Sequence, residues 1–89
     1  MKTKNWPEGV QCGVALTFDL DAETFWFSRT MDSMASPNLM AEGAYGPKVA
    51  VPRILDMLDR LELKATFFIP GWVIEHHTET CREIVRRGH

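Results

Sequence analysis

The sequence predicts an α/β fold in which two parallel β-strands alternate with helices. Two segments, 10–19 and 64–69, are nearly continuous in apolar character, as is typical of parallel strands that are covered on both faces. Each is followed by a stretch whose apolar residues recur at helical spacing. The order strand, long connection, helix, strand, helix corresponds to two βα units, which predicts parallel strands joined by a right-handed crossover.

Length and composition allow at most one small domain. The chain has 89 residues and a net charge of −2, which provides no basic field for nucleic acid. No apolar run approaches the ~20 residues that cross a membrane, and the N-terminus lacks the apolar core of a signal peptide. The two cysteines, Cys12 and Cys81, lie far apart and are interpreted as reduced, buried thiols. We therefore expect a cytoplasmic protein with no nucleic-acid or membrane partner.

The first strand, from Val10 to about Asp19, leads into acidic residues at alternate positions. Side chains two residues apart on a strand point to the same face, so Asp19 and Asp21 would project together, with Glu23 close by. Neighbouring carboxylates repel, and a divalent cation, a shared proton or water must offset that repulsion. The alternative is an Asp-rich turn that only ends the strand.

A long connection over residues 22–46 leaves the strand end that carries the carboxylates. It contains an aromatic run at 25–27 and closes with Gly-Ala-Tyr-Gly at 43–46. In βα architectures this end of the sheet holds binding sites, and long loops there are often functional. The aromatic side chains, Trp26 among them, are candidates to stack on a sugar ring or wall a pocket. The alternative is a short helix that packs the rings on the core.

A helix is predicted from Val49 to Leu61, because Pro52 suits its first turn and apolar residues recur on one face. Arg53, near its start, is a candidate anion clamp or a solvated charge. The second strand, 64–69, is stopped by a Pro-Gly pair.

A short helical turn over 73–77 is expected before a second helix, with Thr78 as its N-cap and Gly88 as its C-cap. His76 and His77 are assigned surface or capping roles, because adjacent helical residues diverge and rarely share one ion. The chain stops at His89, where a third strand would begin. Since two parallel strands do not complete a sheet, we expect residues 1–89 to be the N-terminal part of a larger domain.

The sequence resembles the polysaccharide deacetylase (NodB-homology) family. The pattern around Asp19 and Asp21 is similar to the branch that also holds allantoinase-like and cyclic-imide amidohydrolases. The matching segments follow the family order: 18–23 (Phe-Asp-Leu-Asp-Ala-Glu), 43–46 (Gly-Ala-Tyr-Gly), 51–55 (Val-Pro-Arg-Ile-Leu), 64–72 (Lys-Ala-Thr-Phe-Phe-Ile-Pro-Gly-Trp) and 87–89 (Arg-Gly-His). The fold implied is a distorted (β/α)7 barrel, of which this chain would supply the leading βαβα portion.

The resemblance implies metal-dependent removal of an acyl group from nitrogen. Asp19 matches the family's general base and Asp21 its metal-ligand aspartate. The metal is usually zinc, and two histidines that follow the Gly-His pair complete its site, so they would lie beyond His89. Glu23, Trp26, Tyr45 and Arg53 are candidate substrate-binding residues, for a carbohydrate or another small amide.

Two alternatives come from different classes. An Asp-x-Asp pair after an apolar strand also opens the haloacid-dehalogenase-like phosphohydrolases, but Glu23 and the Pro-Gly pair at 70–71 depart from that pattern. The second alternative is a non-catalytic assembly module that uses the open sheet as an interface. For the 89 residues alone we expect no tightly bound zinc and no hydrolase activity, and apolar surface buried by a second copy or by the rest of the domain.

Overall fold

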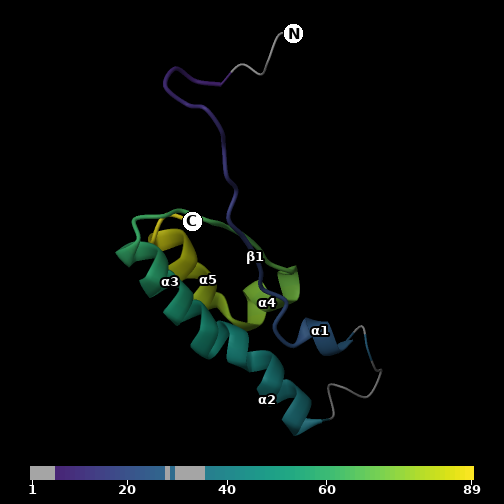
Figure 1. Cartoon of the computed structure of the whole chain (residues 1–89). Coiled ribbons are helices and arrows are strands. Elements are labelled where there is room, and N and C mark those ends of the chain that lie inside the picture. Colours follow the sequence, from purple (N-terminus) through teal and green to yellow (C-terminus); the bar gives the residue numbers. More distant parts are fainter. Residues whose placement is uncertain (1–5, 28, 30–35) are drawn as a thin grey trace.

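The computed structural model describes residues 6–27, 29 and 36–89. Within them, α2, η2 and α3 follow one another as a long helical rod, and α5 lies beside α3 (Figure 1). The elements are, in chain order, β1 (Thr17–Asp19), α1 (Thr24–Phe27), α2 (Pro37–Tyr45), the π-helical turn η2 (Gly46–Ala50), α3 (Val51–Arg60), β2 (Thr66–Phe68), α4 (Gly71–His76) and α5 (Thr78–Arg86).

The two strands pair in parallel, as the βα order predicted. Phe18 lies opposite Phe67 in the register, and their rings stack with centroids 5.2 Å apart. Backbone hydrogen bonds from Thr66 N–H to Leu16 and from Leu20 N–H to Phe68, both 2.9 Å, extend the pairing at its two ends. Because strands joined by a helical crossover run in the same direction, the carboxyl end of β1 lies beside that of β2.

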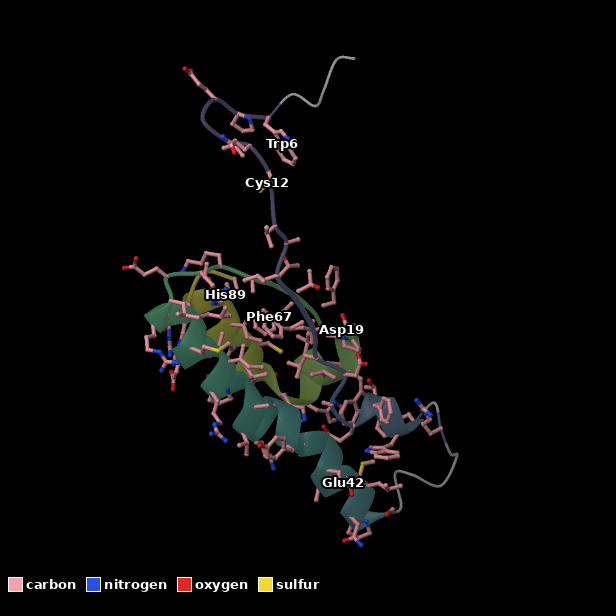
Figure 2. The ribbon with its side chains drawn as sticks, viewed as in Figure 1. Trp6, Cys12, Asp19, Glu42, Phe67 and His89 are labelled. Carbon is pink, nitrogen blue, oxygen red and sulfur yellow. The ribbon has the colours of Figure 1, made fainter. Side chains whose placement is uncertain are left out.

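The predicted strand bounds of 10–19 and 64–69 are too long. Residues 10–16 form an extended, exposed arm rather than a strand, and β2 is limited to Thr66–Phe68. A strand is defined by its ladder, and within the described residues each strand has a single neighbour. Cys12 lies on this arm and Trp6 on the segment that precedes it, both away from the helices (Figure 2). Cys12 is exposed, so the expectation of two buried thiols is wrong for it.

The core lies between the strands and the helices on one face of the pair. It is built from Leu20 after β1, Val51 and Leu55 of α3, Val73 of α4 and Ile84 of α5. Partly buried apolar side chains pack against it: Ala22, Phe67, Ile69 and Trp72. Among the described residues, no helix is both long and apolar enough to cross a membrane.

The opposite face of the strand pair is open. Thr17, Asp19, Thr66 and Phe68 alternate with the inward residues and are exposed, Phe68 by 57%. This alternation follows from the period of two in a strand. It directs Asp19 away from the helical layer.

The long connection holds more structure than predicted. Thr24–Phe27 forms α1 over the aromatic run, and Pro37–Tyr45 forms α2. Ser36 caps α2, with its hydroxyl oxygen accepting a hydrogen bond from Leu39 N–H at 3.4 Å. Residues 28 and 30–35 of the connection lie outside the described part of the chain.

The junction between α4 and α5 corrects one predicted cap. His77, with φ −130°, stands at the N-cap of α5, whereas the Thr78 hydroxyl donates back to the Ile74 carbonyl at 2.8 Å. At the other end of α5 the C-cap is Arg87 rather than the predicted Gly88, and Gly88 follows it in the left-handed region at φ +94°, where glycine is favoured.

Charged side chains join α5 to α3. Arg87 binds Asp56 and Asp59 on α3, both at 2.8 Å, and Glu83 on its own helix at 2.7 Å. The hydrogen bond to Asp56 raises the pKa of Arg87. Burial raises the pKa of the Cys81 thiol on the same helix.

Replacing Leu55 by Ala should destabilise the fold strongly. The side chain is fully buried at 0% exposure in a small core, and similar truncations cost about 2–5 kcal/mol. Urea unfolding followed by circular dichroism would measure the loss. Met57→Ala, at an exposed position on the same helix, is the control, and equal losses for the two variants would contradict the core assignment.

Candidate active site

A pocket of about 370 Å³ opens at the carboxyl end of β1. It brings together the predicted site residues Asp19, Asp21 and Trp26 with Phe25 of the same predicted aromatic run, and it adds Glu42, which was not predicted. Figure 2 labels Asp19 at the end of β1 and Glu42 on α2. The remaining lining residues are Leu20, Ala22, Gly43 and Gly46. The predicted convergence of the two aspartates at one strand end is therefore present.

A tight turn positions Asp21 next to Asp19. The Asp21 carbonyl accepts hydrogen bonds from Thr24 N–H at 3.0 Å and from the Thr24 hydroxyl at 2.5 Å. Ala22 within this turn has φ 51°, in the left-handed region that is uncommon for residues other than glycine. Such a conformation persists only where the surroundings hold it in place.

Glu23 is buried behind the turn rather than placed on the pocket wall. Its carboxylate oxygens lie 2.9 and 3.1 Å from Nε2 of His77, and the two side chains are only 11% and 10% exposed. In the tautomer of His77 that carries hydrogen on Nε2, the ring donates this hydrogen bond and the carboxylate of Glu23 accepts it. This arrangement gives Glu23 a partner inside the protein, and its predicted contact with substrate stays a prediction.

Gly43 allows α2 to approach this turn closely. A Cβ atom at position 43 would lie 2.6 Å from Cα and 2.8 Å from N of Glu23, which no side chain could accept without movement of the backbone. The Gly-Ala-Tyr-Gly stretch of the sequence therefore has a direct packing reason at its first residue.

The other predicted substrate contacts do not reach the pocket. Tyr45 is 54% exposed at the end of α2, and Arg53 is exposed on α3; neither lines the pocket. The pocket's aromatic wall instead consists of Phe25 and Trp26, whose rings pack edge to face with centroids 5.1 Å apart. The roles of Tyr45 and Arg53 stay predictions.

The donor set in the pocket fits part of a metal site. Carboxylate oxygens of Asp19 and Asp21 are hard ligands that suit divalent cations. Within residues 6–27, 29 and 36–89, no group of three or more His, Cys, Asp or Glu side chains could hold an ion. A catalytic zinc site generally uses three protein ligands, so these two aspartates can supply only part of one.

Sequence reasoning missed Glu42 and the partner of Glu23. Ser36 followed by Pro37 is a recognisable helix start that would have placed Glu42 on a helix, although the direction in which that helix faces depends on packing. The contact between Glu23 and His77 joins residues 54 positions apart, and no spacing rule predicts it.

Comparison with known proteins agrees with this architecture. The family model described as polysaccharide deacetylase matches residues 44–89. A peptidoglycan deacetylase of Helicobacter pylori is 34% identical over 76 residues, which are 85% of this chain and 26% of that protein. The crystal structure of a protein assigned as a polysaccharide deacetylase from Mycobacterium smegmatis superposes with a TM-score of 0.89 at 42% identity, over 97% of this chain and 30% of that one.

The chain has an α/β fold with a carboxylate pocket at the carboxyl end of its first strand. The family model matches more than half of its length. The chain belongs to the polysaccharide deacetylase family. It spans between a quarter and a third of the length of these relatives. Family membership leaves no support for the phosphohydrolase alternative.

Replacing Gly43 by Ala should destabilise the protein, although alanine favours helix. The added methyl group would collide with the Glu23 backbone, and such overpacking typically costs about 1–3 kcal/mol. Gly46→Ala is the matched control, because its methyl group would meet only Leu20 Cδ1 at an ordinary 3.5 Å. That variant should be stabilised by up to about 1 kcal/mol through helix propensity. Chemical denaturation would measure the free energy of unfolding of both variants. Equal stabilities would refute the packing role of Gly43.

Proposed function

We propose that these residues form part of the active site of a metal-dependent hydrolase that removes the acetyl group from the nitrogen of an N-acetylated sugar. The observation that carries the proposal is the placement of Asp19 and Asp21 in one pocket beside an aromatic wall. Membership of the polysaccharide deacetylase family supports the reaction class. The Helicobacter pylori relative, named a peptidoglycan deacetylase, supports an acetylated cell-wall sugar as the substrate class.

Each pocket residue has a role that suits amide hydrolysis. Water is a poor nucleophile, and Asp19, exposed at the strand end, is placed to accept its proton as the general base. Asp21 contributes a carboxylate oxygen to a divalent cation, for which zinc is the proposed identity. The rings of Phe25 and Trp26 offer an apolar surface on which the face of a sugar can rest.

A divalent cation would supply Lewis-acid polarisation of the amide carbonyl and lower the pKa of water. The two aspartates would then have different roles, because a carboxylate that binds the cation is a weaker base than one that remains free. The protein's own contribution is to hold both carboxylates at the end of one strand, through the Asp21–Thr24 hydrogen bonds and the β1–β2 ladder.

The complete fold proposed is a distorted (β/α)7 barrel, which these residues begin. Its support is the parallel strand pair with helices on one face and exposed residues on the other. A groove of about 850 Å³ between β2 and α5 is where a further βα unit would pack. Nε2 of His89 is buried there without a hydrogen-bond partner among the described residues. The cytoplasmic location expected from the sequence stays a prediction.

Asp19→Asn and Asp21→Ala should affect the protein that carries these residues in different ways. Asp19→Asn removes the base and should lower kcat by about 10²- to 10⁴-fold while the metal stays bound. Asp21→Ala removes a ligand and should weaken metal binding itself. Deacetylation of an N-acetylglucosamine oligomer and metal content after dialysis would be measured together. Asp56→Asn, on α3 and paired with Arg87, is the control. A nearly active Asp19→Asn variant would refute its assignment as the base.

The 89 residues alone should not retain zinc. Two neighbouring carboxylates suit a weakly held, hydrated Mg²⁺ or Ca²⁺ better than zinc. Elemental analysis after dialysis, combined with light scattering during size exclusion, would test both the metal content and the association expected from the open groove. A monomer that carries one equivalent of zinc would contradict the proposal that further ligands are required.

A further inference from the structure

We propose that His77 is a positioning residue for the candidate active site, acting through its hydrogen bond to Glu23. This inference deepens the proposed function and rests on it. Among the described residues, Glu23 is the one charged residue that is buried, with 8% of the whole residue exposed. It stands two positions after Asp21 and three before Trp26, both of which line the pocket. Movement of Glu23 therefore shifts a carboxylate and an aromatic wall of the pocket together.

Glu23 is held at two places, its backbone and its carboxylate. The backbone of α2 at Gly43 is in such close contact that a Cβ atom there would lie 2.6 Å from Glu23 Cα. Both carboxylate oxygens are within 3.1 Å of Nε2 of His77. A buried carboxylate without a partner is strongly unfavourable, so the hydrogen bond fixes which way Glu23 can turn.

His77 is itself a rigid support. The backbone N–H of His77 donates to the Val73 carbonyl at 2.7 Å, and the backbone carbonyl of His77 accepts from Cys81 N–H at 3.1 Å. The main chain of His77 therefore joins the end of α4 to the start of α5. These two bonds are made by the main chain and persist in any substitution other than proline. Replacing the imidazole therefore removes the contact with Glu23 and leaves the helix junction intact.

A second contact ties the far end of α1 to the same support. Phe27 packs edge to face on Trp72 of α4, with ring centroids 5.0 Å apart. The Trp72 ring lies 6.4 Å from that of His77. The short helix α1, which carries Trp26, is thus docked at both ends on the α4–α5 segment. The second βα unit in this way sets the shape of a pocket built on the first.

The test compares three variants of the protein that carries these residues. His77→Leu removes the donor, His77→Gln retains an N–H donor at a similar reach, and Thr80→Val removes a hydrogen bond to the Pro47 carbonyl elsewhere on α5. We expect His77→Leu to lower kcat and metal affinity by about 10- to 100-fold, as for other residues that orient ligands. His77→Gln should restore most of the loss, and Thr80→Val should change neither quantity.

A readout independent of activity uses the backbone amide signals in NMR spectra. The signals of Asp21, Ala22 and Trp26 should shift in His77→Leu and remain near their original positions in Thr80→Val. If Asp19→Asn abolishes turnover while His77→Leu is fully active with unshifted signals, the positioning role is overturned and the proposed function stands. If neither aspartate matters for turnover, the proposed function fails, and the amide shifts alone decide the positioning role.

Should His77→Leu fail to fold, Glu23→Gln provides the second measurement. The amide keeps the size and the acceptor of Glu23 but loses its charge, so a smaller shift of the same three signals and a smaller loss of metal affinity are expected. Unchanged signals and unchanged metal affinity in Glu23→Gln would overturn the inference.

Discussion

The buried carboxylate of Glu23 is the constraint on which the candidate site depends. Its burial requires a hydrogen-bond donor, which His77 supplies at 2.9 Å, and its backbone leaves room for no side chain at position 43. The turn that precedes it places Ala22 in a strained conformation. Three elements distant in sequence, the end of β1, α2 and the α4–α5 junction, therefore meet at one residue directly behind the pocket.

The strand pair explains why the chemistry lies where it does. Because side chains alternate between the two faces of a strand, Phe18 and Leu20 point into the helical layer and Asp19 points to the open face. The carboxylate of Asp19 therefore stays out of the core. The same geometry leaves Phe68 exposed and a groove between β2 and α5. The relatives to which this chain is similar are about three to four times as long.

Much of this could be predicted from local patterns. The apolar runs predicted the parallel strands, and Pro52 with the apolar periodicity predicted the helix over α3. Gly88 predicted the left-handed residue at the end of α5. Strand lengths were overestimated, because a ladder depends on neighbours and not on propensity alone. The convergence of Asp19, Asp21 and Trp26 followed from position at a strand end. The Glu23–His77 hydrogen bond and the place of Glu42 could not be predicted in this way, because both depend on how the helices pack in space.

Paramagnetic broadening by Mn²⁺ would test whether the turn after β1 is the cation-binding centre. Carboxylate oxygens suit this ion, and amide signals close to it broaden first as it is added. If Asp19 and Asp21 bind the ion, the signals of residues 19–22 should broaden before all others. Earliest broadening at the other acidic cluster, Asp56, Asp59 and Glu83, would contradict it.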